Sequence, residues 1–221
     1  MSYKYEMHCH TSMVSQCGRT APKDIVDMYR GKGYSGLVVT EHYSPLTFGV
    51  NSYKADRMID FYLSSYYEFK KHETDDFSVF FGMELRHFAT GADYLIYGVD
   101  PDWLRQQSNL LVKWEKPVYE LMHKEGYLVF QAHPFRPYIL RCNPKYIDGI
   151  EIYNGKCDKK TNDKAAKWAE KTGKLVVSGS DFHEAKNLAR GGIITERKIK
   201  DNKDLVELLK SQEFELIKTY D

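Results

Sequence analysis

Short apolar runs alternate along the chain with longer segments of helical periodicity. The short runs are rich in Val, Ile, Leu, Phe or Tyr and mostly lack charge, a composition typical of strands buried on both faces. In the run nearest the N-terminus, Lys4 and Glu6 alternate with apolar residues. Strands are predicted at Tyr3–His8, Gly36–Thr40, Ser78–Gly82, Tyr94–Gly98, Tyr127–Gln131, Gly149–Ile152 and Leu175–Ser178.

Helices are predicted between most of these strands, because apolar residues there recur every three or four positions. The first predicted helix follows Thr20, a residue type that often caps helix N-termini, and several end at glycine. The link from Glu84 to Tyr94 is too short for a helix, so a hairpin or loop is expected there. The predicted helices are Pro22–Gly31, Lys54–Lys71, Val112–Glu125, Thr161–Thr172 and Asp204–Gln212.

This alternation predicts an α/β fold, either a parallel barrel of the TIM type or a doubly wound open sheet. Neither GxGxxG nor GxxxxGK[ST] follows the first predicted strand, which favours the barrel. We find no repeat, low-complexity tract or long linker, so one domain is expected over residues 1–221.

Composition narrows the class of function. The chain has 42% hydrophobic and 29% charged residues, as an ordinary globular protein has, and a formal net charge of +1. That balance argues against extended nucleic-acid binding but leaves room for a local cationic pocket. No apolar run is long enough to cross a membrane, and the start of the chain does not resemble a secretory signal. The four cysteines are therefore expected to be free thiols in a reducing cytoplasm.

Residue types that bind metals follow most of the predicted strands. They are His8 and His10, Glu41 and His42, Glu84, Asp93, His133, Glu151 and Asn154, and Asp181 and His183. In parallel α/β folds the carboxyl ends of strands share one face, where functional groups collect. A single histidine after a strand is more often structural, which is our interpretation of His72, His87 and His123. The other five histidines recur at the ends of four separate predicted strands, and this repetition predicts a metal site.

The spacing of these residues supports the metal site. Residues i and i+2 of a strand point to the same side, so His8 and His10 can face one ion while Cys9 points away, and Asp181 and His183 can do the same. Imidazole and carboxylate ligands suit Zn, Mn or Fe. A carboxylate such as Glu84 can bridge two ions, and ions about 3.5–4 Å apart can activate water for phosphoryl transfer.

The ordered segments HCHT, TEH, GMEL, AHPF, EIYN and GSDFH resemble the polymerase and histidinol phosphatase (PHP) domains across nearly the whole chain. The resemblance implies a distorted (β/α)7 barrel, two or three divalent ions and phosphoesterase activity. It further implies that His8, His10, Glu84 and Asp181 bind one ion, that Glu84 and His133 bind a second, and that His42 and His183 bind a third.

Three positions depart from the family pattern. Family members commonly place another His or Asp ligand shortly after the HxH pair, where the nearest candidate here is Gln16. Asp93 is the best match to a histidine that many members carry near the fourth strand, and we include it as a metal ligand. Glu41 replaces the aspartate of a TDH segment and is expected to support the ligands.

A mechanism follows as a hypothesis. A metal-bridging hydroxide attacks phosphorus in line, the ions neutralise the phosphate oxygens, and Asp181 helps orient water. Arg136 and Arg190 each lie just after a ligand segment and are the leading candidates to grip the phosphate, with Arg19 as a third. A surface ion pair is the alternative interpretation for each arginine.

The predicted substrate is a small phosphomonoester, such as histidinol phosphate or a nucleotide. The first alternative is an amidohydrolase-type enzyme that cleaves C–N bonds, since such enzymes also carry HxH on the first strand of a barrel. The second alternative is a non-catalytic metal-binding regulatory module, which should have lost several ligands. The sequence does not distinguish among Zn, Mn and Fe or among individual phosphomonoesters, and it predicts no oligomeric state.

Overall fold

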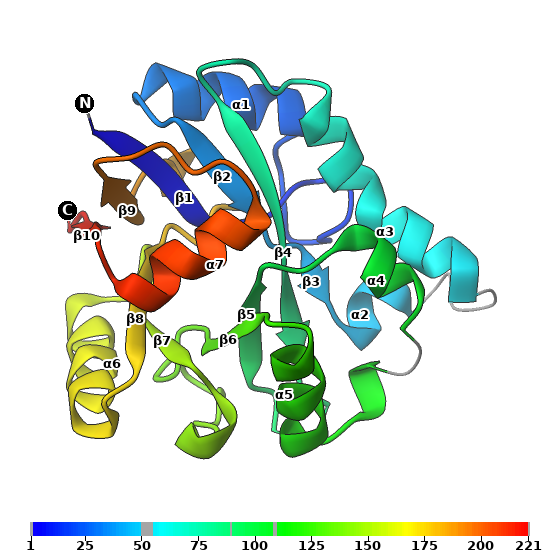
Figure 1. Ribbon diagram of the computed structural model, residues 1–221, viewed down its shortest axis with the longest axis vertical. Helices are drawn as coiled ribbons and strands as arrows, with labels where there is room; N and C mark the ends of the chain where they lie inside the picture. Colours follow the sequence, from blue (N-terminus) through cyan, green and yellow to red (C-terminus); the bar gives the residue numbers. More distant parts are fainter. Residues whose placement is uncertain (1, 50–54, 89, 108–109, 221) are drawn as a thin grey trace.

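The computed structural model describes residues 2–49, 55–88, 90–107 and 110–220 (Figure 1). Its strands are β1 (Tyr3–Cys9), β2 (Gly36–Val39), β3 (His42–Tyr43), β4 (Ser78–Arg86), β5 (Asp93–Tyr97), β6 (Leu128–Gln131), β7 (Gly149–Asn154), β8 (Leu175–Gly179), β9 (Gly191–Thr195) and β10 (Glu215–Lys218). Its α-helices are α1 (Pro22–Gly31), α2 (Pro45–Phe48), α3 (Ala55–Lys70), α4 (Pro101–Arg105), α5 (Glu115–Lys124), α6 (Lys159–Thr172) and α7 (Asn202–Ser211), and short 3₁₀ turns span Leu110–Val112, Pro144–Tyr146 and Ala185–Asn187.

The strands form one sheet that curls into a nearly closed barrel. Its order is β10-β9-β1-β2-β4-β5-β6-β7-β8, with β3 beside β4. β8 also packs against β1 and β9, and a parallel bridge joins Cys9 to Phe182 just after β8. The predicted α/β barrel is therefore confirmed, and the helices lie around its outside and across one end (Figure 1).

The barrel is distorted because it is not parallel throughout. β1, β2 and β4 run parallel, as do β6, β7 and β8, but β5 is antiparallel to both β4 and β6. The expected hairpin between Glu84 and Tyr94 is present, since Glu84 pairs with Leu95 and Arg86 with Asp93. This reversal places the first residue of β5 at the end of the barrel where its neighbours finish.

Among the described residues, five short strands and α-helices were not predicted. β3 has two residues and α2 and α4 have four and five, too few for a periodic pattern. β9 begins with Gly191 and Gly192, and β10 is partly exposed with charged residues at both ends. The predicted helix at Val112–Glu125 begins only at Glu115, and Lys54 of the predicted Lys54–Lys71 helix lies outside the described residues.

Helix α7 closes the barrel end opposite to the predicted ligands. Its apolar face joins a core cluster with side chains from most of the strands. The side-chain amide of Asn202, at its first turn, donates to the backbone oxygens of Phe81 and Val99. The end at which β1, β4, β6, β7 and β8 finish is left open for a site. The cluster contains Tyr5, Met7, Val38, Phe80, Leu95, Tyr97, Leu128, Phe130, Val177, Ile193, Leu205, Val206, Leu208 and Leu209, among others.

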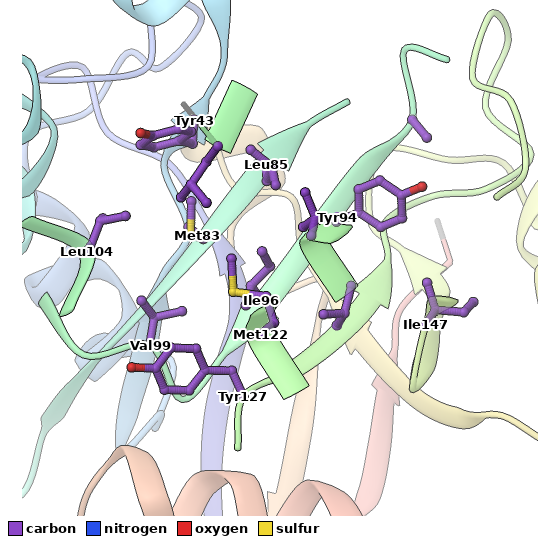
Figure 2. Packing of buried hydrophobic residues seen from close by; sticks show 14 of the residues in the cluster. Tyr43, Met83, Leu85, Tyr94, Ile96, Val99, Leu104, Met122, Tyr127 and Ile147 are labelled. Atoms are coloured by element: carbon purple, nitrogen blue, oxygen red, sulfur yellow. The ribbon is translucent and has the colours of Figure 1, made fainter. Parts of the chain in front are cut away.

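A second core cluster packs on the outer face of β4 and β5 (Figure 2). Met83 and Leu85 of β4 point into it, so the strand alternation turns Glu84 to the opposite side. The aromatic segment of α3 also faces this cluster, where Tyr62 and Leu63 are fully buried, as expected for the core face of a helix. Among the described residues, no helix is long and apolar enough to cross a membrane.

Candidate metal centre

Three groups of ligand atoms form at the open end of the barrel. Within each group, atoms able to bind a metal lie within 4.8 Å of one another. The groups are His8, His10 and Asp181; His8, Glu84 and His133; and His10, His42 and His183. The structure thus brings together every predicted metal-binding residue except Asp93. We call His8, His10, Glu84, His133 and Asp181 the inner cluster, and His10, His42 and His183 the outer cluster.

Glu84 occupies the middle of the site. Its Oε1 lies 3.0 Å from Nε2 of His133 and 3.4 Å from Nε2 of His8. Its Oε2 lies 2.5 Å from Nδ1 of His42 and 3.5 Å from Nε2 of His10. Because the two oxygens face different histidines, this carboxylate has the placement that a bridging ligand needs.

Asp181 borders both clusters from the end of β8. Its Oδ1 lies 3.6 Å from Nε2 of His8, 3.5 Å from Nε2 of His10 and 3.2 Å from Nδ1 of His183. Its Oδ2 faces two cations, with Nη1 of Arg136 at 3.3 Å and Nζ of Lys156 at 3.8 Å. The Asp181 carboxylate therefore lies between the histidines and the two cations, Arg136 and Lys156.

Several buried polar atoms of the inner cluster lack a hydrogen-bond partner among the described residues. They are Nε2 of His8, Nε2 of His10 and Nδ1 of His133, whereas Oε2 of Glu84 has the close contact with Nδ1 of His42. Folded proteins satisfy most buried polar atoms, so such a concentration needs an explanation. Nitrogen donors that converge without partners beside a carboxylate fit divalent metal ions.

The electrostatics keep the two carboxylates and His10 in forms that bind metal. Although burial lowers the pKa of His8, His42, His133 and His183, the neighbouring carboxylates raise it overall, so these rings must lose a proton to bind an ion. Although burial raises the pKa of Glu84, the charges of His42 and His8 hold that pKa well below its ordinary value. The pKa of Asp181 is also lowered, against the effect of burial, chiefly by His8. Burial and the neighbouring His42 and His183 lower the pKa of His10. Ionised carboxylates and a neutral imidazole are the species that coordinate metals.

Glu151 supports the inner cluster from β7. It accepts a hydrogen bond from Nδ1 of His8 at 2.8 Å, from the backbone N–H of His133 at 2.9 Å and from the side chain of Asn154 at 2.9 Å. The contact to His8 fixes the tautomer that presents Nε2 to the cavity, a common arrangement behind metal-binding histidines.

Glu41 has the corresponding role on the other side, as expected for a supporting residue. It accepts hydrogen bonds from the hydroxyls of Thr11 and Ser15. Oγ of Ser15 in turn lies 3.2 Å from Nδ1 of His10 and accepts from the backbone N–H of His42 at 3.1 Å. One carboxylate thereby orients histidines of both clusters.

Two ligand candidates lie on strained backbone. His133 has φ 28° and Asp181 has φ 51°, in the left-handed region that favours glycine. Such strain is costly and persists mainly at functional sites. Each residue lies two positions after a strand end, and each belongs to a group of ligand atoms.

Asp93 is the one predicted ligand that joins none of the three groups in the described part of the chain. It is 3% exposed, and its Oδ2 lies 3.4 Å from Nη1 of Arg86. Burial and the charge of Glu84 raise the pKa of Asp93 to about 6. It therefore lies near the site, in contact with an arginine.

The remaining candidates are three arginines and Gln16, and they occupy different places around the site. Arg136 contacts Asp181, and Arg19 lines a cavity of about 420 Å³ together with His42 and Arg86. Arg190 lies beside Gly155, at the turn after β7. Gln16 donates from its side chain to the backbone oxygen of Leu46 and lines the same cavity as Arg19.

The three histidines interpreted as structural have other partners. His72 faces Glu68, His87 contacts Thr90, and His123 contacts Asp148. None of the three belongs to a ligand group among the described residues.

Two residues of the site escaped the sequence analysis. The thiol of Cys17 lies 3.0 Å from Nε2 of His183. Burial raises the pKa of the Cys17 thiol, but hydrogen bonds with His183 and His42 lower it more strongly, to about 6. Nζ of Lys156 lies 3.3 Å from Nδ1 of His183 and belongs to the segment EIYNGK. Its position two residues after Asn154, at a strand end, was the available signal.

Comparisons with known proteins agree with this fold. A family model described as PHP-associated matches residues 159–214. A search of curated proteins finds no match. The resemblance to the PHP family is confirmed by this match over residues 159–214.

Solved structures share the fold at low sequence identity. PsfC of Pseudomonas syringae superposes with a TM-score of 0.70 at 17% identity, over 99% of this chain and 92% of that one. The lesion-specific endonuclease PfuEndoQ of Pyrococcus furiosus has a TM-score of 0.66 at 14% identity, over 98% of this chain and 58% of that one. A candidate metal-dependent phosphoesterase of Bifidobacterium adolescentis has a TM-score of 0.54 at 14% identity, over 93% of this chain and 95% of that one.

Proposed function

We propose that this protein is a metal-dependent phosphoesterase that hydrolyses a small phosphomonoester. The observation that carries the proposal is the pair of clusters around Glu84, bordered by two cations on Asp181. The names of two structurally similar proteins support it, because a phosphoesterase and an endonuclease both act on phosphate esters.

The inner cluster would hold two divalent ions, with Glu84 between them, and the outer cluster a third. The ions are Zn, Mn or Fe, which imidazole and carboxylate ligands suit. When bound, they would acidify a water molecule and neutralise charge on the phosphate oxygens.

The chain's own cations would orient the phosphate. Arg136 and Lys156 both lie against Oδ2 of Asp181, so a phosphate beside Asp181 would meet a guanidinium and an ammonium. Guanidinium can grip two phosphate oxygens at once, and ammonium acts as a point charge. Arg190 is retained as a further candidate for this role. A neutral amide would have less use for such cations, which favours a phosphate ester over a C–N bond.

The cavity beside the outer cluster suits a small substrate. It measures about 420 Å³ and is lined by His42, Arg19 and Arg86, among others. Pockets for small molecules commonly measure about 300–1,000 Å³. The two arginines would favour an anionic substrate, in keeping with a nucleotide or an amino-alcohol phosphate such as histidinol phosphate.

A product screen tests this function. Metal-loaded protein would be assayed for phosphate release from sugar phosphates, nucleotides and amino-alcohol phosphates, and for ammonia release from amides and amidines. We expect metal-dependent phosphate release from at least one phosphomonoester. Ammonia release alone would show a C–N hydrolase, and cleavage of oligonucleotides alone would show a nuclease. Metal binding without turnover of any substrate would show a regulatory module.

A further inference from the structure

The loop between β1 and α1 carries a thiol to the outer cluster. Sγ of Cys17 lies 3.0 Å from Nε2 of His183, and Cys17 and His42 line the same cavity. Cys17 is solvent-exposed, whereas Cys9 and Cys142 are buried in the core. The thiol therefore lies at the open side of a cluster that otherwise consists of imidazoles.

Backbone contacts on both sides of Cys17 fix this position. The N–H of Gly18 donates to the oxygen of Ser15 at 2.9 Å, and the N–H of Arg19 donates to the oxygen of His183 at 2.8 Å. A Cβ on Gly18 would lie 2.0 Å from the backbone oxygen of Thr11, so only glycine permits this close turn. The loop is thus joined directly to the residue whose ring faces the thiol.

A second observation shows that the outer cluster is directed at a ligand. Nε2 of His10 is fully buried, belongs to this cluster and has no hydrogen-bond partner among the described residues. Nδ1 of His10 faces Ser15, so its one free nitrogen can bind a single ion, and the inner cluster also uses it. His42, His183 and a Cys17 thiolate then make a three-donor set for the outer ion, with the fourth position of a tetrahedral zinc site left open.

We propose that Cys17 is the third protein ligand of the outer ion, beside His42 and His183, bound as a thiolate after losing its proton to solvent. Because thiolate is a soft ligand, this position should prefer Zn or Fe over Mn, whereas the inner cluster offers only nitrogen and oxygen donors. The inference rests on the proposed metal site, and it assigns different metal preferences to the two clusters of that site.

Cobalt substitution tests the proposal without relying on activity. Metal-free protein would be titrated with Co²⁺, and absorption would be recorded in the visible and near-ultraviolet ranges. We expect a thiolate-to-cobalt charge-transfer band in the wild-type protein and in Cys157→Ser. In Cys17→Ser the band should be absent and affinity for the outer ion at least about 10-fold weaker, while the absorption of the inner ions persists. Cys17→His should restore binding of the outer ion without the band.

Alkylation of the wild-type protein provides a measurement that needs no variant. Iodoacetamide labelling of Cys17, followed by mass spectrometry, should be fast without metal and strongly slowed when three ions are bound, while labelling of Cys157 changes little. The proposal would be overturned if the protein bound three ions and Cys17 were labelled equally fast, or if the band disappeared in Cys157→Ser instead. Uptake of only two ions would also overturn it and would leave the phosphoesterase proposal intact. Failure to bind any metal would overturn both.

Discussion

The inner and outer clusters share His10 but are built in different ways. Side chains of the inner cluster are at most 2% exposed and lie in strands of the barrel or within two residues of a strand end. In the outer cluster, the side chain of His42 is 25% exposed, and Cys17 beside it comes from a loop. Strand register positions most of the inner donors and also pairs His42 of β3 with Glu84, whereas His183 and Cys17 lie in loops. We therefore expect the inner cluster to be essential for metal binding and turnover. The outer cluster should be able to lose its ion while the inner ions remain bound.

Removal of ligands should have the largest effect, and the loss of metal should differ between the two clusters. In His8→Ala or Asp181→Ala, metal content should fall to about one ion or none, and turnover should fall by more than about 100-fold, the upper end of the loss found when only a supporting residue is removed. His42→Ala should lose one ion and keep the inner pair. Elemental analysis and phosphate release measure both, with the exposed Asp27→Ala as control. Equal metal loss in His42→Ala and His8→Ala would contradict the division into two clusters.

Glu151→Gln should weaken the inner cluster by a smaller amount. The amide keeps the size of the side chain but weakens the hydrogen bond that orients His8. Removing such support typically costs about 10–100-fold in metal affinity or activity. Competition with a metal-binding dye measures the affinity. The control is Glu207→Gln, whose carboxylate lies against Lys210 on the surface. If affinity were unchanged in Glu151→Gln, the proposed role of Glu151 would be wrong.

Arg136→Ala should impair substrate binding without removing metal. A hydrogen bond to a charged group contributes about 1.5–3 kcal/mol, so kcat/KM should fall about 10-fold or more while the metal content stays constant. The matched control is Arg141→Ala, because Arg141 lies over the ring of Phe135 in the same connection after β6. An equal loss in both variants would show that the loop as a whole, and not the Arg136 guanidinium, is responsible.

Glu6→Gln should affect activity least and should instead change the pH dependence of stability. Burial raises the pKa of Glu6 from 4.5 to about 7, so the folded protein holds this proton more tightly than the unfolded chain does. The stabilising contribution is therefore complete below about pH 4.5 and is lost as the pH rises through about 7. Each unit of pKa shift corresponds to about 1.4 kcal/mol.

Denaturant unfolding of metal-loaded wild type and Glu6→Gln at several pH values measures this contribution. The free energy of unfolding of the wild type relative to the variant should fall between pH 4.5 and 7 and then become constant. Glutamine can still accept the hydrogen bonds from the backbone N–H groups of Met7, His8 and Ser180. A constant difference across this range would show that Glu6 titrates normally.

The sequence predicted the inner cluster better than the outer one, for a physical reason. Strand alternation placed His8 and His10 on one side, and Cys9 packs on the other against α1. Parallel strands end at the same edge of a sheet, so the sequence alone predicts that Glu84 and His133 lie close together. The arrangement of these donors follows from periodicity and strand direction, both of which can be read from the chain.

The parts that were missed depend on contacts between distant segments. The reversal of β5 places Asp93 opposite Arg86, and no local pattern reveals the direction of a strand. In the loop after β1, the close turn at Gly18 directs Cys17 to His183 and leaves Gln16 facing Leu46. Gln16 and Cys17 are adjacent in this loop, and spacing alone does not show which of them faces His183.

Anomalous diffraction from crystals of the metal-loaded protein would test the central claim most directly. Two peaks should lie within bonding distance of the inner cluster, on either side of the Glu84 carboxylate, and a third beside His42 and His183. Peaks confined to surface residues, or none near Glu84, would contradict the account.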